Sequence, residues 1–173
     1  VTLSEHTLLK YLSSLEKRGI VHSRKEGNLK IYEISLNSAF VKVFFSYFDL
    51  ERLHRLEYKR GTAIQVFVEK IKNIKIPYFT LLFGSTAKEN YTAKSDIDLI
   101  VVYGAGEKGA TKGIDSLKKQ ILAETGLRLN SIVMRLDEFL KERENKQNYA
   151  LQDALSYGYP VFGNQLYYEI MFQ

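Results

Sequence analysis

Two short stretches, LFGSTAK at residues 82–88 and SDIDLIVV at residues 95–102, decide which fold this sequence predicts. The first is an apolar segment that ends in Gly84 and Ser85, and the second carries Asp96 and Asp98 at the start of an aliphatic run. Side chains alternate across a strand, so the two carboxylates lie on one face and can share a hard cation such as Mg2+. Backbone N–H groups at a glycine turn can face an anion, and glycine leaves room for a phosphate. Together the stretches predict metal-dependent chemistry on a nucleotide.

Neither stretch is specific alone, because Gly-Ser turns are common and an Asp-x-Asp pair is usually a solvated polar face. Their combination at this spacing, inside apolar strands, is specific. It resembles the small nucleotidyltransferase domains of the DNA polymerase β superfamily. The resemblance implies that Gly84, Ser85 and Lys88 bind a nucleoside triphosphate. It also implies that Asp96 and Asp98 are catalytic and bind Mg2+ as the cofactor.

The third acidic residue that this family usually places on the next long strand is missing. That strand is RLNSIVM at residues 128–134, and the resemblance assigns the catalytic position to Asn130. An amide can coordinate a metal through its carbonyl oxygen, but it carries no charge and accepts no proton as a carboxylate does. Asp137 and Glu138 follow the strand, and we interpret them as the acidic first turn of a helix. Whether the protein is an enzyme therefore stays open.

A second glycine-rich segment, GAGEKG at residues 104–109, matches the dinucleotide-binding fingerprint literally. In a true fingerprint the last glycine lies in the opening turn of a helix, whereas the next helical pattern here begins near Ile114. We therefore interpret the segment as a flexible loop.

Composition sets wider limits. The 173 residues include no cysteine, so disulfides, thiolate nucleophiles and sulfur-ligated zinc are excluded, and the three histidines lack metal-ligand spacing. No apolar run is long enough to span a bilayer, and the first residues show no signal-peptide pattern. We expect no membrane association and a cytoplasmic location.

Charge is concentrated in the N-terminal part of the chain. Residues 1–75 contain 14 Lys+Arg against 8 Asp+Glu, a net charge of +6, while residues 76–173 have a net charge of −1. This asymmetry favours contact between the N-terminal part and a polyanion, although such a charge can also serve solubility.

The N-terminal pattern predicts a helix, a strand, a turn and a second strand. Ser4 can cap a helix that ends near Gly19, and the turn at residues 26–28 precedes a run of alternating residues at 29–34. This order resembles the second half of a winged helix-turn-helix domain. The resemblance implies that the helix reads DNA bases while the strands contact phosphate. The DNA-binding residues that it assigns are Ser4, His6, Thr7, Lys10, Tyr11, Arg24, Lys25 and Lys30.

The helices that precede the recognition helix in that family are absent, and the chain starts at Val1, which we interpret as a truncation. A winged module can also serve protein contact instead of DNA. Residues 39–75 predict two connecting helices with a break near Arg60 and Gly61. The aromatic residues between Phe40 and Phe48 are either core against the wing or a self-association surface, and the resemblance to winged regulators implies a homodimer.

These expectations give an α+β fold with three parts: a partial winged helix domain at residues 1–38, connecting helices at 39–75, and a nucleotidyltransferase-like mixed sheet flanked by helices at 76–173. The aromatic tail from Leu151 is interpreted as packing. Two functions stay open: transfer of a nucleoside monophosphate to an acceptor hydroxyl, coupled to a DNA-binding module, and DNA-binding transcriptional regulation with a catalytically degenerate nucleotide-binding domain. The resemblance to toxin-antitoxin nucleotidyltransferases also implies a small helical protein partner.

Overall fold

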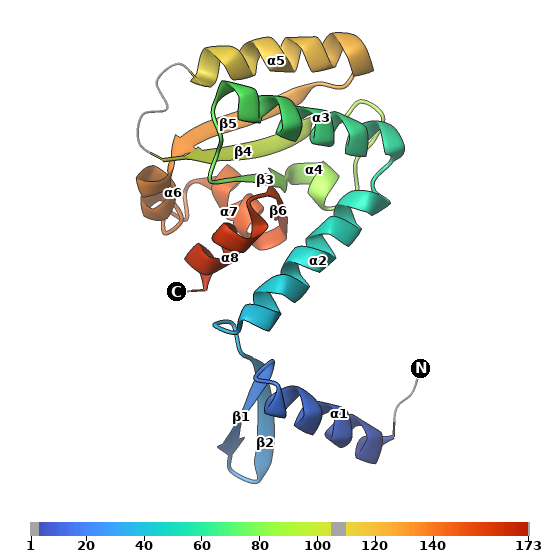
Figure 1. Cartoon of the computed structure of the whole chain (residues 1–173), viewed down its shortest axis with the longest axis vertical. Coiled ribbons are helices and arrows are strands. Elements are labelled where there is room, and N and C mark those ends of the chain that lie inside the picture. Colours follow the sequence, from blue (N-terminus) through green and yellow to red (C-terminus); the bar gives the residue numbers. More distant parts are fainter. Residues whose placement is uncertain (1–3, 105–109, 173) are drawn as a thin grey trace.

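The computed structural model describes residues 4–104 and 110–172. Its elements form a mixed α+β fold in which an N-terminal unit is joined by a long helix to a sheet domain (Figure 1). In chain order they are α1 (Glu5–Lys17), β1 (Val21–Glu26), β2 (Leu29–Ile34), α2 (Ala39–Arg55), α3 (Tyr58–Ile74), β3 (Phe79–Phe83), α4 (Gly84–Ala87), β4 (Ile97–Tyr103), α5 (Ala110–Thr125), β5 (Leu129–Arg135), α6 (Leu136–Glu142), α7 (Tyr149–Tyr157), β6 (Tyr159–Phe162) and α8 (Asn164–Met171).

The larger sheet has the strand order β5-β4-β3-β6. Strands β4 and β5 are parallel and are connected through α5, whereas β3 is antiparallel to both β4 and β6. In this register Asp98 pairs with Phe83 on one side and with Asn130 on the other. The pairing therefore brings the end of β3 and the starts of β4 and β5 to one edge of the sheet.

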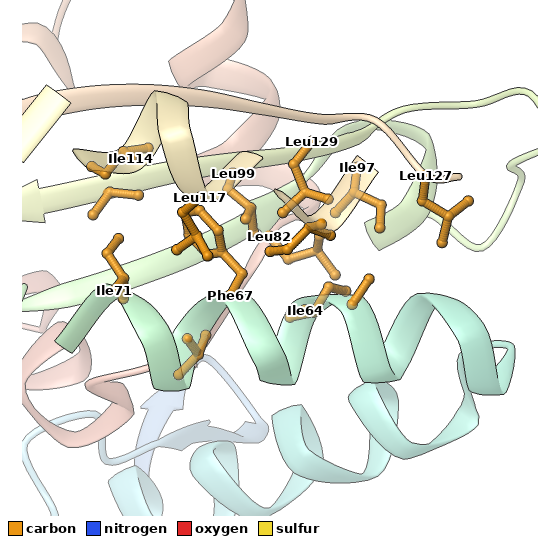
Figure 2. Packing of buried hydrophobic residues seen from close by; sticks show 14 of the residues in the cluster. Ile64, Phe67, Ile71, Leu82, Ile97, Leu99, Ile114, Leu117, Leu127 and Leu129 are labelled. Atoms are coloured by element: carbon orange, nitrogen blue, oxygen red, sulfur yellow. The ribbon is translucent and has the colours of Figure 1, made fainter. Parts of the chain in front are cut away.

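Helices α3 and α5 cover one face of the sheet, where the larger apolar core lies (Figure 2). Ile64, Phe67 and Ile71 recur at helical spacing on α3 and are fully buried against Leu82 and Leu99. Helix α3 thus packs as part of the sheet domain, although residues 39–75 were expected only to connect. The break between the two helices lies at Leu56, not near Arg60 and Gly61 as predicted, because both of those residues are inside α3.

Helices α6, α7 and α8 cover the other face, where Phe79 makes edge-to-face contacts with Phe139 at 5.1 Å and Tyr167 at 5.3 Å between ring centroids. The aromatic tail does pack here, but it also adds β6 to the sheet, which was not predicted. The strand is only four residues long and includes Pro160. Proline is tolerated there because β6 is an edge strand.

Most predicted elements of the sheet domain are present. The apolar segment before Gly84 forms β3, the aliphatic run that begins at Asp96 and Asp98 forms β4, and the strand expected at 128–134 is β5. Asp137 and Glu138 do lie in the first turn of α6. Helix α5 begins at Ala110, four residues before the expected start. Of the glycine-rich segment, residues 105–109 lie outside the described part of the chain.

The N-terminal unit has the predicted order of one helix and a two-stranded antiparallel hairpin. Ser4 caps α1 by accepting a hydrogen bond from the backbone N–H of Thr7 at 3.3 Å, and the hairpin turns at Gly27 with a φ of +60°. Within residues 4–104 and 110–172, no helix is both long enough and apolar enough to cross a bilayer.

Helix α2 is hydrogen-bonded to the sheet domain through the side chain of Asp49, a residue that is buried at 4% exposure. Its carboxylate accepts hydrogen bonds from the Tyr168 hydroxyl at 2.7 Å and the Asn164 amide at 3.2 Å, both on α8. Burial raises the pKa of Asp49 from 3.8 to about 6, because desolvation of the charged form outweighs the two hydrogen bonds.

This raised pKa predicts a pH dependence of stability. Because the folded protein holds the proton more tightly, the stabilising contribution of Asp49 is complete below pH 3.8 and is lost as the pH rises through about 6. Asp49→Asn stays neutral and keeps an oxygen that accepts from Tyr168. Its free energy of unfolding is expected to exceed the wild-type value by up to about 3 kcal/mol near pH 8, and by little near pH 4.

Urea unfolding across this pH range measures the difference. Glu51→Gln is the matched control, since it removes an exposed carboxylate from the same helix. A difference between Asp49→Asn and the wild type that does not change with pH would contradict the assignment.

Candidate functional site

Two carboxylates and one amide converge where β4 and β5 begin. The side-chain nitrogen of Asn130 donates hydrogen bonds to Asp96 Oδ2 at 3.0 Å and to Asp98 Oδ1 at 3.1 Å. Both aspartates therefore face the same side, as the strand alternation predicted, and Asn130 is their neighbour, as the resemblance implied. Hard oxygen ligands with two negative charges suit Mg2+, which commonly takes one or two carboxylates and completes its shell with water and substrate phosphates.

The donor set contains no third ionisable ligand. In the described part of the chain, no group of three acidic, histidine or cysteine side chains could hold a metal ion. Asp96 and Asp98, with the carbonyl oxygen of Asn130, thus fit one divalent cation whose other positions stay open. The residue at 130 leaves the pair with less negative charge than a third carboxylate would provide.

The Gly-Ser turn lies directly beside this pair. Gly84 has a φ of +68°, a conformation that favours glycine, and a Cβ added there would lie 2.5 Å from Asp98 Oδ2. Glycine is therefore required for two reasons, the backbone conformation and the close approach of Asp98. The turn starts the short helix α4, which carries Ser85 into the site.

A cavity of about 730 Å³ opens over these residues. Its polar lining includes Ser85, Asp96, Asp98 and Asn130, and its apolar lining includes Leu122 and Leu127. Two cations, Lys94 and Arg128, also line it, and neither makes an ion pair or hydrogen bond through its side chain with the described residues. Positive charge without a protein partner, beside a carboxylate pair, suits the phosphates of a metal-bound nucleotide.

The sequence analysis missed Lys94 and Arg128, although a signal exists for Arg128. Arg128 lies two residues before Asn130, and residues two apart on an extended segment share a face, so it could have been placed beside Asn130. Lys94 lies in a turn closed by a hydrogen bond from the Ser95 N–H to the Thr92 carbonyl oxygen, where strand alternation does not apply.

Lys88, by contrast, does not line this cavity. It follows α4, forms an ion pair with Asp153 and lies 4.9 Å from the ring centroid of Tyr157. Asp153 also accepts the backbone N–H of Gly84 at 3.2 Å. The Lys88–Asp153 ion pair therefore supports the Gly-Ser turn from the side of α7. Lys88 lines a separate hollow with Arg52 and Tyr157.

A buried arginine supports the segment in front of Asp96. Arg60 on α3 is fully buried and donates to the carbonyl oxygens of Thr92 at 2.7 Å and Ser95 at 2.8 Å, and to the Thr86 hydroxyl at 3.2 Å. Thr86 in turn donates to the carbonyl oxygen of Asp96 at 3.2 Å. Arg60 thus ties α4 to the segment that positions Asp96.

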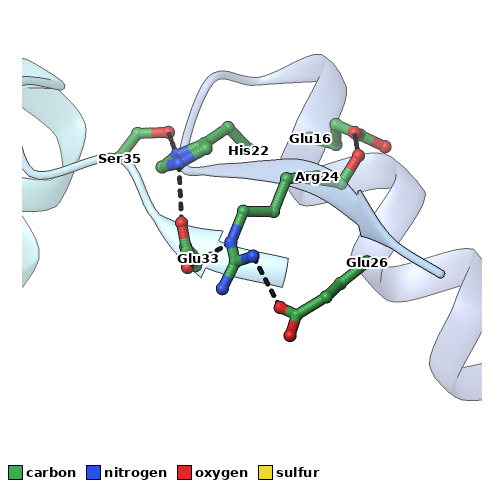
Figure 3. Close-up of polar contacts among 7 residues, drawn as sticks. Glu16, His22, Arg24, Glu26, Glu33 and Ser35 are labelled. Carbon is green, nitrogen blue, oxygen red and sulfur yellow. Dashed lines mark hydrogen bonds and ion pairs between the residues drawn. The ribbon is translucent and has the colours of Figure 1, made fainter. Parts of the chain in front are cut away.

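The cations expected to contact DNA divide into paired and unpaired groups. Arg24 pairs with Glu26 at 2.7 Å and Glu33 at 2.9 Å (Figure 3), and the hydrogen bonds that it donates to Glu33 and then to Glu26 raise its pKa. Lys30 pairs with Glu16 at 3.0 Å. Lys10 and Lys25 are exposed and have no ion-pair partner among the described residues.

The remaining expected contacts lie along α1. The hydroxyl of Thr7 is hydrogen-bonded to that of Ser4 at 2.8 Å, so both side chains are engaged in the helix cap. His6 and Tyr11 are exposed, as the DNA-reading interpretation requires of residues that reach bases.

The chain belongs to the nucleotidyltransferase domain family. The match, described as "Nucleotidyltransferase domain", covers residues 64–159, from inside α3 to the first residue of β6. It includes Gly84, Ser85, Asp96, Asp98 and Asn130, and it does not include the N-terminal unit.

Among solved structures, a crystal structure described as a "putative nucleotidyltransferase" from Sulfolobus solfataricus resembles this chain at 21% sequence identity, with a TM-score of 0.32. The similarity covers 53% of this chain and 78% of that one. No curated protein matches the chain.

Proposed function

We propose that the protein transfers a nucleoside monophosphate from a nucleoside triphosphate to an acceptor hydroxyl in a Mg2+-dependent reaction. The observation that carries the proposal is the position of Asp96 and Asp98 beside the Gly84 turn, in a cavity that also presents Lys94 and Arg128. Carboxylates for a cation and free cations for phosphates are what an in-line displacement at phosphorus requires.

In the proposed reaction, the acceptor oxygen forms a bond to the α-phosphorus while the bond from that phosphorus to the pyrophosphate oxygen breaks. Mg2+, when bound, would neutralise charge that develops on the phosphate oxygens. Asp96 and Asp98 would hold the ion, and Lys94 and Arg128 would bind the phosphates. Asn130 has no basic oxygen, so Asp96 and Asp98 are the carboxylates lining the cavity that could accept the hydroxyl proton.

A second candidate function is a regulator whose nucleotide site binds without turnover. Asn130 favours it, because an amide that donates to both carboxylates replaces the residue best placed to act as a base. Binding would then require only that the amide release the two carboxylates to the cation.

Asn130→Asp separates the two functions. Isothermal titration of the wild type with each nucleoside triphosphate, with and without Mg2+, measures binding, and α-phosphate-labelled nucleotide detects transfer to protein, RNA or small acceptors. If the chain is an active enzyme, the wild type forms product. If it is a degenerate binder, the wild type binds without product and Asn130→Asp gains transfer, by about 10²-fold or more where proton transfer limits. A wild type without Mg2+-dependent nucleotide binding would refute both.

We further propose that the N-terminal unit binds DNA and so couples nucleotide binding to a DNA-reading module. The net charge of +6 in residues 1–75 and the unpaired Lys10 and Lys25 support phosphate contact. Ser4, His6, Thr7 and Tyr11 would select bases, while Arg24 and Lys30 would have to exchange their glutamate partners for phosphate.

Mobility-shift titrations at several salt concentrations test this proposal. Lys25→Ala is expected to weaken binding across sequences and to reduce the salt slope by about one. Arg24→Ala is the informative comparison. The charge of Arg24 is already compensated by two glutamates, so we expect this substitution to weaken DNA binding less than Lys25→Ala does. No salt-sensitive shift, or a shift that neither substitution changes, would remove the support.

A further inference from the structure

The first half of α2 carries apolar side chains on two opposite sides, although only one of these sides is covered. Phe45, Asp49 and Leu53 face the sheet domain, where Phe45 lies 5.2 Å from Tyr168 and 5.5 Å from Phe172 between ring centroids. A surface helix normally exposes a polar face opposite its buried apolar face. The outer side of α2 carries a surface that we call the α2 stripe: Phe40, Val43, Phe44, Tyr47, Phe48 and Leu50, which are between 47% and 67% exposed.

The N-terminal unit beside this stripe buries none of its own helix or strand residues. Neither α1 nor the β1–β2 hairpin contains a residue that is buried. An apolar hollow of about 290 Å³ lies between the unit and α2, lined by Leu15, Ile20 and Ile34 and, from α2, by Val41, Phe44, Phe45 and Phe48. Phe44 and Phe48 belong to both the hollow and the α2 stripe, so the two form one continuous apolar surface.

We infer that the α2 stripe is the interface through which two copies of this chain form a dimer. The stripe, with the adjoining exposed Ile34 and Leu36, offers on the order of 800 Å² of apolar side-chain surface, which is the share of one partner in a stable interface of standard size. Surface patches of this extent are typical of interaction sites.

The charge distribution favours a second copy. The chain has a net charge of +5, so two copies repel unless they meet at an uncharged surface. The α2 stripe contains no charged residue. Of the two charged residues between Phe40 and Leu50, Asp49 is buried on the opposite side and Lys42 is half-buried outside the stripe. Contact through the stripe therefore brings no like charges together.

The stripe also has parts that can meet in a reciprocal contact. It contains an exposed aromatic side chain, Phe40 at 64% exposure, and it adjoins the apolar hollow through Phe44 and Phe48. Antiparallel packing of two α2 helices about Phe44 would place Phe40 of each copy against Phe48 of the other. An interface with two-fold symmetry requires this kind of reciprocal contact, with an aromatic anchor entering a pocket.

Sedimentation equilibrium of the whole chain tests the inference. The wild type is expected to be a dimer, and Phe44→Glu a monomer with unchanged circular dichroism, because two carboxylates would be buried at the two-fold axis. Tyr149→Glu, which changes an exposed aromatic residue on α7, is the matched control and should remain dimeric.

A second measurement uses the absence of cysteine from the chain. A single Val43→Cys substitution on the stripe is expected to form a disulfide-linked dimer under mild oxidation, whereas Tyr149→Cys should stay unlinked. A monomeric wild type, an equal rate of cross-linking at both positions, or a stripe that binds lipid vesicles or another protein as a monomer would overturn the inference. None of these outcomes depends on the nucleotide chemistry.

Discussion

Asp98→Ala is expected to abolish Mg2+-dependent nucleotide transfer, or Mg2+-dependent nucleotide binding if the wild type does not turn over. Asp98 is the residue on which the site converges: it pairs in the sheet with Phe83 and Asn130, and its carboxylate lies against the Gly84 turn. A metal clamp on a phosphoryl group contributes several kcal/mol, which corresponds to a loss of about 10³-fold or more in rate.

The variant should remain folded, because the alanine side chain removes an ion ligand and no apolar contact from the core. Asp137→Ala is a suitable control, since this aspartate lies in the first turn of α6 and pairs with Arg135 at 2.9 Å, away from the cavity lining. Labelled-nucleotide transfer and calorimetry in the presence and absence of Mg2+ measure the effect. Unchanged Mg2+ dependence in Asp98→Ala would disprove the metal assignment.

Arg60→Met is expected to lower the free energy of unfolding by roughly 3–5 kcal/mol, a large share of the 5–15 kcal/mol typical of a domain. Methionine retains an apolar side chain but leaves the carbonyl oxygens of Thr92 and Ser95 without their charged donor. The stacking of the guanidinium 4.4 Å from the ring centroid of Tyr91 is lost as well.

The effect should extend to the site, because the segment freed by the substitution is the one that leads to Asp96. We expect weaker Mg2+-dependent nucleotide binding under conditions where Arg60→Met is still folded. The free energy of unfolding of Arg60→Lys should lie between those of the wild type and Arg60→Met, because lysine keeps the charge but cannot reproduce the planar set of donors of the guanidinium. Arg55→Met, at an exposed arginine of α2, should change stability by no more than about 0.5 kcal/mol. Urea unfolding measures all three, and a loss below about 1 kcal/mol in Arg60→Met would refute the bracing role.

Local sequence rules predicted correctly where the two aspartates and the glycine turn lie. The alternation of side chains along a strand placed Asp96 and Asp98 on one face, and the glycine turn was expected at the end of the preceding strand. The position of Asn130 came from the family resemblance, and the register of β4 with β5 confirms it. The alternation and the glycine turn depend on residues that are neighbours in the sequence. The position of Asn130 follows from a family motif whose spacing corresponds to a fixed arrangement of strands.

Other features depend on contacts between distant segments and were not predicted. Arg60 reads as an ordinary cation near a helix break, and only the packing of α3 on the sheet buries it beside residues 92–95. The resemblance assigned Lys88 to the nucleotide, whereas the structure pairs it with Asp153 from α7, outside the cavity lining. The strand β6 escaped notice because a four-residue edge strand with a proline carries little periodic signal.

By itself, then, the sequence determined the family of the sheet domain, the carboxylate pair with its glycine turn, and the amide that replaces a third acid. The tertiary structure decided which cations face the cavity, which arginine supports it and which side of α2 is left uncovered. The reason is physical. The periodicity of side chains along a helix or strand and the residues that favour a turn act between neighbours in the sequence. The burial of a charge or the exposure of an aromatic residue depends instead on which distant segments pack against it.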